Sequence, residues 1–343
     1  ALWAKMRGGG FQRFFNRYGD IISIAHLLIS WTEFLCGKHK RKDVIEFSVD
    51  VMDHIVQLHE SLVNKTYCHG PYSPFRINDP KPRDIHKASV ADRIIHHALY
   101  RALSPFFEQK FIFDSYSCRP DKGMHRAIDR FRDVARKVSR NHTRTCWVLK
   151  CDIRKCFASL NHEVLLAILR KYIADKDVLW LLESVIESFP AGLPLGNVTS
   201  QIFINIYLNE LDQFVKRTLK MKQYIRYADD FVILHQDRQV LERLIPRIAY
   251  FVEAHLCMSL HPKKLFLETV ASGVDFLGWV HFPHHRVLRT STKHRMMRRL
   301  EQHISKEMVA SYLGMLSHGN AYTLAEEVRS IGWFSERPEG ASK

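Results

Sequence analysis

Two acidic residues, Asp229 and Asp230, lie between two segments with strong strand character, and this arrangement constrains the fold more than any other feature of the chain. Residues 223–227 are rich in aromatic and β-branched side chains, and residues 231–234 form a continuous apolar run. We therefore predict a strand on each side of the acids. The residues between them lack the Asn-Gly or Asp-Gly pair of an ordinary tight hairpin. The expected hairpin holds both acids in its turn and directs their carboxylates away from a buried sheet.

A third acid, Asp152, follows another predicted strand and lies 77 residues before Asp229. Residues 146–151 are largely apolar and lead directly into this acid. Residues 192–201 then form a loop that contains Gly and Pro and opens a helix, with Thr199 or its neighbour Ser200 as the expected cap. An isolated acidic turn is more often simply solvated. The order of strand and acid, loop and helix, and acidic hairpin instead favours phosphoryl chemistry with hard cations.

With these motifs in this order, the chain resembles the reverse transcriptases, whose palm has an aspartate on one strand and a Tyr-x-Asp-Asp hairpin on the next. Further segments match that family in the same order, and they are Lys81-Pro-Arg83, Asp92-Arg-Ile-Ile-His96, Leu260-His-Pro-Lys-Lys264 and Phe276-Leu-Gly-Trp279. The resemblance covers about residues 45 to 300. It implies an α+β, right-hand polymerase fold with fingers, a palm of antiparallel sheet plus helices, and a short helical thumb.

The resemblance also implies a division of the chain into regions. The expected regions are an N-terminal arm over 1–40, fingers with the start of the palm over 41–145, a palm with possible fingers insertions over 146–282, and a thumb with the C-terminal tail over 283–343. The arm would include a flexible joint at the three glycines 8–10. Helical spacing of apolar residues predicts one helix over about 43–64, and the basic tail from about residue 290 is also expected to be helical.

The family's catalytic roles transfer to residues at matching positions. Asp152, Asp229 and Asp230 would be ligands of two Mg²⁺ ions, with Mn²⁺ as a substitute. The backbone carbonyl of Ile153 would add a further ligand. Lys264 would donate a proton to the pyrophosphate leaving group, and the alternative is a plain surface lysine. These roles describe nucleotidyl transfer to a primer 3′ end.

Substrate contacts are implied in the same way. Lys81 and Arg83 would hold the nucleoside triphosphate, while Arg93 would either support them or form a structural salt bridge. Phe157 would exclude a ribose 2′-hydroxyl, the alternative being a core aromatic at a helix start, and Tyr227 would also contact substrate. The remaining implied residues are Gly196, Asn197 and Gln201 in the templating pocket and Phe276, Leu277, Gly278 and Trp279 in the primer grip.

The loop over residues 193–201 narrows the resemblance within the family. Intron-encoded enzymes usually have Gln-Gly here and end the segment in Ser-Pro, whereas the sequence Leu-Gly-Asn-Val-Thr-Ser-Gln over 195–201 is similar to reverse transcriptases of diversity-generating retroelements. Those enzymes make cDNA with errors at adenine, and a basic oligomeric accessory protein accompanies them. Intron-type enzymes, defence-type bacterial enzymes and a non-catalytic RNA-binding scaffold remain as alternatives.

The charge balance agrees with a polyanionic partner such as template RNA and the primer–cDNA duplex. The chain has 51 Lys and Arg against 36 Asp and Glu, a formal net charge of +15. Neutralising phosphates releases counterions, so binding to nucleic acid should be strong and dependent on salt. The seven cysteines include no C-x-x-C pair, which favours reduced thiols. We expect no membrane segment or signal peptide, and a cytoplasmic location for a bacterial, archaeal or phage-encoded protein.

Overall fold

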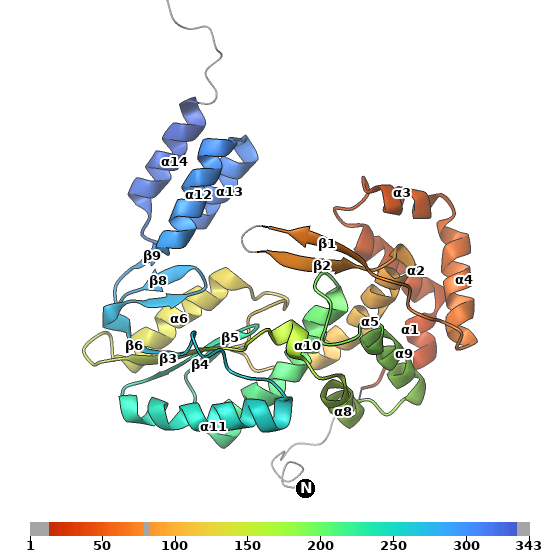
Figure 1. The fold of residues 1–343 in the computed structure, drawn as a ribbon, viewed down its shortest axis with the longest axis horizontal. Coiled ribbons are helices and arrows are strands. Elements are labelled where there is room, and N and C mark those ends of the chain that lie inside the picture. The colour runs from red at the N-terminus through yellow and green to blue at the C-terminus, as the bar shows by residue number, and fades with distance from the viewer. Residues whose placement is uncertain (1–13, 79–81, 335–343) are drawn as a thin grey trace, which may run out of the picture. The chain divides into compact units, whose positions relative to one another are not determined.

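The computed structural model describes residues 14–78 and 82–334, and they divide into two compact units. The first, which we call the helical unit, combines the chain up to Phe113 with Ile153–Leu219 and Arg247–Leu260. The second, the sheet unit, combines Asp114–Asp152, Lys220–Pro246 and the chain from His261 onward. Each unit is therefore assembled from segments that are far apart in the sequence (Figure 1).

The helical unit contains most of the N-terminal half of the chain. Its elements are α1 (Tyr18–Ile22), α2 (Ile24–Leu35), α3 (Lys42–Val49), α4 (Val51–Val63), β1 (Ser73–Ile77), β2 (Arg83–Lys87), α5 (Val90–Glu108), α7 (Cys156–Ser159), α8 (His162–Tyr172), α9 (Lys176–Glu187), α10 (Val198–Gln213) and the π-turn η2 (Phe214–Thr218). Strands β1 and β2 form an antiparallel hairpin. Helix α10 is buried on nearly every face, so it is the central element of this unit rather than a surface helix with one apolar stripe.

One expectation for the N-terminal region differs from the structure. The single helix predicted over 43–64 is wrong, because the chain leaves the helical conformation at Asp50, where φ is −117° and ψ is 39°, and this divides α3 from α4. The segment expected to be an arm contains α1 and α2 from Tyr18 onward. Helix α2 packs against α5, and the Nε2 atom of His26 lies 3.2 Å from the Ala98 carbonyl oxygen. The glycines 8–10 lie outside the described residues.

The sheet unit is built on a four-stranded antiparallel sheet in the order β4-β5-β3-β6. The elements of this unit are α6 (Met124–Val138), β3 (Trp147–Asp152), β4 (Tyr224–Tyr227), β5 (Asp230–His235), β6 (Phe266–Thr269), the 3-10 turn η3 (Val270–Ser272), β7 (Val274–Phe276), β8 (Trp279–His281) and β9 (Arg286–Leu288), and α11 (Arg238–Leu256) begins here. Strands β7, β8 and β9 form a second antiparallel sheet.

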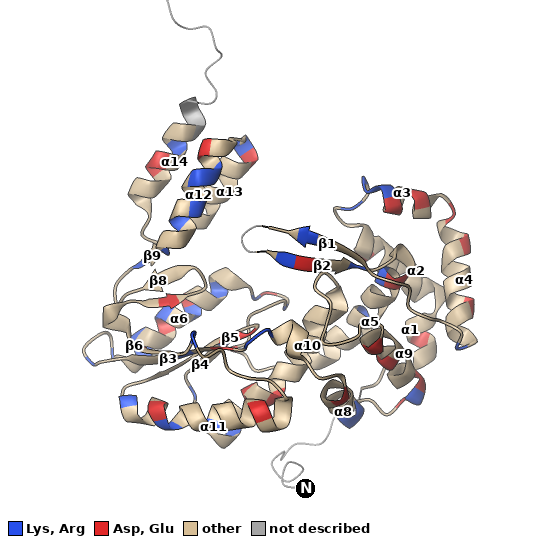
Figure 2. Cartoon of the chain, viewed as in Figure 1, with Lys and Arg blue, Asp and Glu red and all other residues tan. Residues whose placement is uncertain are grey.

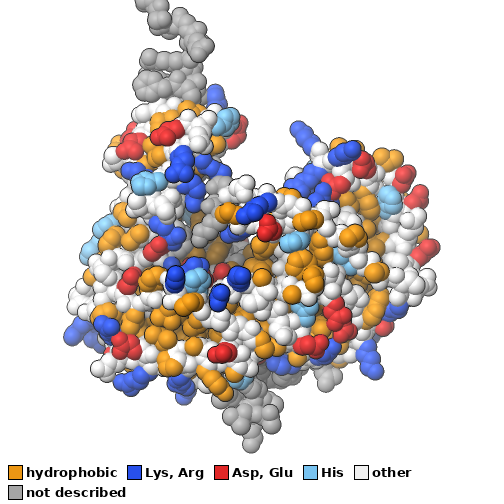
Figure 3. All heavy atoms as spheres, in the orientation of Figure 1, with side chains coloured by type: hydrophobic (Ala, Val, Ile, Leu, Met, Phe, Trp, Pro, Cys, Tyr) orange, Lys and Arg blue, Asp and Glu red, His pale blue; other side chains and the backbone are white. Residues whose placement is uncertain are grey.

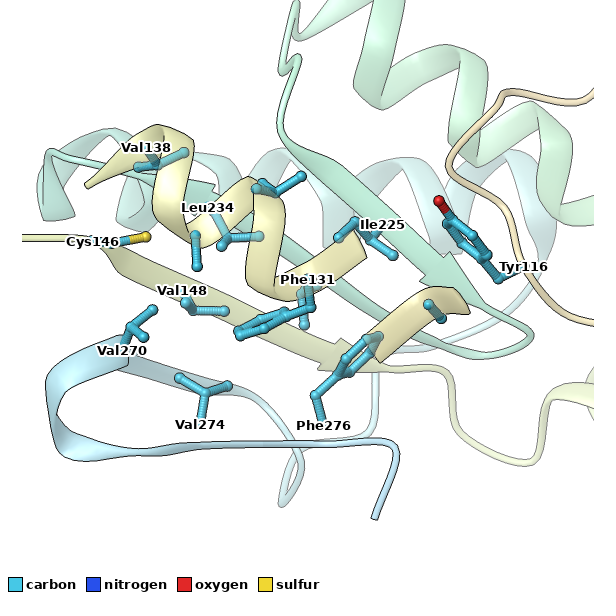
Figure 4. Close-up of a cluster of buried hydrophobic side chains, with 14 residues drawn as sticks. Tyr116, Phe131, Val138, Cys146, Val148, Ile225, Leu234, Val270, Val274 and Phe276 are labelled. Atoms are coloured by element: carbon cyan, nitrogen blue, oxygen red, sulfur yellow. The ribbon is translucent and has the colours of Figure 1, made fainter. Parts of the chain in front are cut away.

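A hydrophobic core fixes α6 against one face of the larger sheet (Figure 4). Phe131 of α6 is fully buried beside Val148 of β3 and Leu234 of β5, and its ring centroid lies 5.6 Å from that of Phe276. Burying side chains of this size supplies the main favourable free energy for the packing of these elements. The mixture of helices and antiparallel sheet confirms the predicted α+β class.

The C-terminal region consists of α12 (Thr290–Gln302), α13 (Lys306–Leu316) and α14 (Tyr322–Phe334), as the helical prediction for the tail required. Met296, Leu300 and Val328 form a core of their own with neighbouring apolar residues. Helix α12 also has a row of Lys and Arg residues (Figure 2), which contribute basic side chains to the surface in the space-filling view (Figure 3). Among the described residues, none of the helices has the length and apolar composition needed to cross a lipid bilayer.

Candidate active site

The acidic hairpin is formed by β4 and β5 in the sheet unit. Tyr227 pairs with Asp230, so the turn consists of Ala228 and Asp229 alone. Ala228 has φ of 52°, an uncommon conformation for a residue with a Cβ atom, and its carbonyl accepts a hydrogen bond of 3.1 Å from Nη1 of Arg226. The prediction that both acids lie in the turn is wrong for Asp230, which is the first residue of β5. The two acids therefore have different surroundings.

Strand β3 brings the third acid to the hairpin. Asp152 is the last residue of β3, as predicted, and in the antiparallel register of β3 and β5 it stands directly opposite Asp230. Side chains opposite each other in such a pair have Cβ atoms about 4.5–5.5 Å apart, and like charges in these positions destabilise a sheet. The pairing therefore concentrates negative charge where a purely structural sheet would avoid it.

Each of these opposed acids has a lysine partner. The Nζ atom of Lys264 donates a hydrogen bond of 2.8 Å to Oδ2 of Asp152. The Nζ atom of Lys150 lies 3.8 Å from Oδ2 of Asp230 and donates a hydrogen bond of 2.5 Å to the backbone carbonyl of Asp275. Sequence reasoning found Lys264 through its motif but missed Lys150. The available signal was a single charged residue inside the apolar run that leads to Asp152.

Lys150 and Lys264 offset only part of the electrostatic cost of placing these carboxylates close together. Burial, together with the nearby carboxylates of Asp152 and Asp229, raises the pKa of Asp230 from 3.8 to about 7, although Lys150 opposes this shift. Oδ1 of Asp230 is also buried and has no hydrogen-bond partner among the described residues. A buried oxygen of this kind costs free energy unless something binds it. A hard cation is the ligand that suits a group of carboxylate oxygens.

The acids do not form a complete metal cage on their own. In the described part of the chain, no group of three or more His, Cys, Asp or Glu side chains is placed to hold a metal ion. Ile153, the other expected ligand, is fully buried and forms an isolated β-bridge with Leu260 in the helical unit. The observations that fit a cation are thus the donor chemistry, the charge balance and the unpartnered oxygen of Asp230.

The expected sugar-discriminating residue, Phe157, lies on the short helix α7 of the helical unit and is partly buried. Its backbone carbonyl accepts a hydrogen bond of 2.7 Å from the amide of Leu193. Gly192 has φ of +68°, and a Cβ atom there would lie 2.4 Å from the Phe157 carbonyl oxygen. Only glycine allows this close approach, so Gly192 fixes the backbone position of Phe157. Sequence analysis did not assign Gly192 a role.

The residues expected to bind the triphosphate differ in their exposure and in their contacts. Arg83 is exposed at the first position of β2, whereas Lys81 lies outside the described residues. Arg93 is 9% exposed, forms an ion pair with Asp43 and donates a hydrogen bond of 3.2 Å from Nε to the Ser89 carbonyl. Arg93 thus makes the salt bridge that was one of its two expected roles.

The loop expected to line the templating pocket is held tightly within the helical unit. The amide of His86 in β2 donates a hydrogen bond of 3.0 Å to the carbonyl of Leu195. Gly196 has φ of +115°, and a Cβ atom there would lie 2.8 Å from Ile85. Asn197 is 3% exposed, and its Nδ2 atom has no hydrogen-bond partner in the described part of the protein. Gln201, in contrast, is exposed on α10.

The cap predicted for α10 is also different. The N-cap residue is Asn197, and its side chain makes no capping hydrogen bond. Thr199, which was one of the two expected caps, instead lies 2.6 Å from a ring nitrogen of His96 through its hydroxyl oxygen. The first turn of this helix is therefore fixed by a tertiary contact rather than by a local cap.

The four residues expected to form the primer grip lie at the hairpin between β7 and β8. Phe276 and Trp279 are buried and pair across this hairpin. Leu277 and Gly278 form its turn with φ of 51° and 85°. The aromatic residues therefore anchor the hairpin in the core of the sheet unit, and its turn is partly buried, with Leu277 packed against that core.

The antiparallel sheet brings Asp152 opposite Asp230 and beside the hairpin of Asp229, and carboxylates suit the hard metal ions that phosphatases, polymerases and nucleases use. Comparison with known proteins gives the family. The model of the family "Reverse transcriptase (RNA-dependent DNA polymerase)" matches residues 78–281. The chain belongs to the reverse transcriptase family, and thus to a family of RNA-directed DNA polymerases.

Individual relatives include bacterial proteins and a protein of a fungal intron. Protein YkfC of Escherichia coli K12 is 27% identical over 300 residues, which cover 72% of this chain and 76% of that protein. The group II intron-encoded protein LtrA of Lactococcus lactis subsp. cremoris is 24% identical over 241 residues, which cover 65% of this chain and 38% of LtrA. An uncharacterized 91 kDa protein in the cob intron of Schizosaccharomyces pombe is 27% identical over 181 residues, covering 49% and 21%. The chain thus matches well under half of the latter two relatives.

Proposed function

We propose that this protein synthesises cDNA on an RNA template and that Asp152, Asp229 and Asp230 hold the two Mg²⁺ ions required for nucleotidyl transfer. The observation that carries the proposal is the register of β3 and β5, which sets Asp152 opposite Asp230. The unpartnered oxygen of Asp230 and its raised pKa support a cation at this position. Family membership supports the reaction.

The metal ions supply a defined part of the chemistry. When bound, they would activate the primer 3′-hydroxyl and neutralise charge on the attacked phosphate and the leaving pyrophosphate. The Ile153 carbonyl is proposed as a further ligand, and Mn²⁺ as a substitute ion. Lys150 and Lys264 hold Asp230 and Asp152 in place through the contacts described above.

Lys264 has a second proposed role as a proton donor. Its side chain is 43% exposed while Nζ bonds to Asp152, so the ammonium group is both ordered and accessible to substrate. It would transfer a proton to an oxygen of the leaving pyrophosphate. A positioned ammonium group of this kind acts as a general acid.

Other residues are proposed to bind and orient substrate. Arg83 and Lys81 would hold the triphosphate, and Phe157 would exclude ribonucleotides from the sugar site. Tyr227 would contact the nucleotide, and Gly196, Asn197 and Gln201 would contact the templating base. The turn at Leu277 and Gly278, supported by Phe276 and Trp279, would hold the primer end.

The finer division into fingers, palm and thumb also belongs to this proposal. Helices α12 to α14 would form the thumb and grip the template–primer duplex. Lys293, Arg298 and Arg299 are exposed on α12, which gives that helix several positive charges suited to phosphate backbones. Arg93, through its pair with Asp43, would support the fingers rather than contact the triphosphate.

Two biological settings are supported by different observations. The loop over 193–201 favours an enzyme of a diversity-generating retroelement, which would make errors at adenine and work with a basic accessory protein. The similarity to LtrA favours an intron-type enzyme. Sequencing cDNA made on a defined RNA separates them, because errors concentrated opposite template adenines support the first and accurate copies support the second. Replacing Gln201 with Ala should change the error spectrum more than the stability.

Primer extension tests the polymerase activity itself. The assay uses a defined RNA template, Mg²⁺ and deoxynucleoside triphosphates, with the wild type beside Asp229→Ala. We expect cDNA from the wild type alone and similar RNA binding by both proteins. Equal synthesis by Asp229→Ala would refute the site. Tight RNA binding without synthesis by the wild type would instead favour the non-catalytic scaffold.

A further inference from the structure

A chain of buried hydrogen bonds connects the start of α10 to the segment before β1 in the helical unit. The hydroxyl oxygen of Thr199 lies 2.6 Å from Nδ1 of His96. The Nε2 atoms of His96 and His69 are 3.1 Å apart, and Nδ1 of His69 lies 2.7 Å from the carbonyl oxygen of Gly70. His96 and Thr199 are only 2% and 1% exposed, so water does not substitute for these contacts.

The proton positions in this series of hydrogen bonds follow from the groups at its two ends. The carbonyl of Gly70 can only accept, so Nδ1 of His69 donates to it. Burial lowers the pKa of His96 to about 3, so its ring is neutral and has one N–H group. If Nε2 of His69 accepts, His96 donates from its own Nε2 and accepts from the Thr199 hydroxyl at Nδ1. One set of tautomers then satisfies every ring nitrogen in this series of hydrogen bonds.

A second branch from His69 reaches the same loop. The ring of His69 stacks on that of Tyr72, with centroids 4.8 Å apart and an interplanar angle of 29°. The Tyr72 hydroxyl lies 2.9 Å from the Ser188 hydroxyl, and the nearby Asn197 side chain opposes the rise in the pKa of Tyr72 that burial causes. His69 is thus linked to Asn197 through Tyr72 and to Thr199 through His96. These two residues flank the first position of α10.

A buried carboxylate holds the segment around His69 in place. Asp92 is 3% exposed and accepts hydrogen bonds from the Tyr67 hydroxyl at 2.8 Å, the Ser89 hydroxyl at 2.6 Å and the Gly70 amide at 3.2 Å. Buried polar groups are tolerated when hydrogen-bond donors satisfy them. These hydrogen bonds attach the segment that contains His69 to α5.

We propose that Tyr72, His69 and His96, which we call the His69 clamp, are positioning residues that set the conformation of residues 196–201 and hence the selection of the incoming nucleotide. The N-cap residue of α10 makes no side-chain capping hydrogen bond, and the clamp contacts the first turn through Thr199. The hydrogen bond from His86 to Leu195 ties the same loop to β2, the strand of Arg83. The catalytic part of this inference rests on the proposed polymerase function.

Thr199 offers a matched test of the clamp. Thr199→Val keeps the side-chain shape and removes the hydroxyl, while Thr199→Ser keeps the hydroxyl. Loss of one such hydrogen bond should raise the KM for deoxynucleoside triphosphates about fivefold and change the misincorporation frequency, with little effect on kcat. The Ser variant should retain wild-type values. Tyr72→Phe, which removes the other hydroxyl, should act in the same direction as Thr199→Val.

The conformational part of the proposal is measured without substrate. Nitrogen-15 NMR of the histidine rings should find His69 protonated at Nδ1 and His96 at Nε2, and amide exchange over 198–201 should be faster in Thr199→Val and Tyr72→Phe. If exchange is faster but KM and error frequency match the wild type, the role in nucleotide selection is refuted. Unchanged exchange in both variants refutes the clamp itself. A wild type that fails to extend primers refutes the polymerase proposal, while the exchange result still decides the clamp.

Discussion

Replacing Asp230 with Asn should make the metal-free protein more stable at high pH while destroying its synthetic activity. The pKa of Asp230 is raised from 3.8 to about 7 in the folded protein. The folded state therefore binds the proton more tightly than the unfolded state. Stability contributed by the protonated group is fully present below about pH 4 and is lost as the pH rises toward 7.

The size of this effect follows from the shift. Each pKa unit corresponds to 1.36 kcal/mol, so ionising Asp230 costs the folded state roughly 4 kcal/mol by about pH 8. The Asn side chain cannot ionise. We expect Asp230→Asn and wild type to have similar unfolding free energies near pH 4, and the variant to be more stable by up to roughly 4 kcal/mol near pH 8.

The assay is urea unfolding with EDTA at several pH values, followed by the same series with Mg²⁺. Mg²⁺ should stabilise the wild type at high pH and thereby reduce its difference from the variant, because a ligand that binds only the folded state raises its stability. A difference that is independent of pH would refute the assignment of Asp230 as the destabilising group. Asp84→Asn, at an exposed position on β2, is the matched control for the substitution itself.

Three further substitutions test the neighbouring assignments. Phe157→Val should increase ribonucleotide incorporation relative to deoxynucleotides by at least about tenfold, since the steric exclusion of the 2′-hydroxyl is worth more than about 1.4 kcal/mol; unchanged discrimination in a competition assay would remove that role. Gly192→Ala should lower the unfolding free energy by at least about 2 kcal/mol in denaturant titrations, because its Cβ atom would meet backbone at 2.4 Å in a left-handed conformation, and a stability equal to wild type would contradict the crowding. Lys264→Gln should reduce kcat by about 10²-fold or more with RNA binding preserved, as expected for a general acid, and an unchanged kcat in single-turnover extension would leave Lys264 as a partner of Asp152 alone.

The strands that form the site could be predicted because their sequences favour a strand over a helix or a loop. Residues 223–227 and 231–234 combine β-branched and aromatic character with an intervening turn, and the apolar run before Asp152 ends at the acid itself. The position of Asp230 could not be predicted in this way. Whether the hairpin turn has two or three residues depends on the register in which the two strands pair. Tyr227 pairs with Asp230 only because Ala228 adopts a positive φ that sequence rules assign to Gly or Asn.

Long-range contacts explain what sequence analysis missed. Thr199 was expected to cap α10 because Thr is a good N-cap, but its hydroxyl instead bonds to His96, more than 100 residues away in the chain. Lys150 was overlooked because a lysine inside a strand usually points to solvent, whereas here it lies between Asp230 and the carbonyl of Asp275. The contact of Thr199 leaves no local pattern, and that of Lys150 leaves only a single charge inside an apolar run, since the partner of each residue depends on which segments the fold brings together.

The arrangement of charge around the acids connects the fold to the proposed chemistry. Strands β3 and β5 place two carboxylates opposite each other at a cost in stability, and Lys150 and Lys264 compensate that cost only in part, because the pKa of Asp230 remains near 7. A site satisfied entirely by its lysines would gain little from a cation. A site with one buried, unpartnered carboxylate oxygen gains stability when a cation binds, so the same imbalance that weakens the empty sheet favours metal binding. This is why metal-dependent stability and metal-dependent synthesis should be lost together in Asp230→Asn.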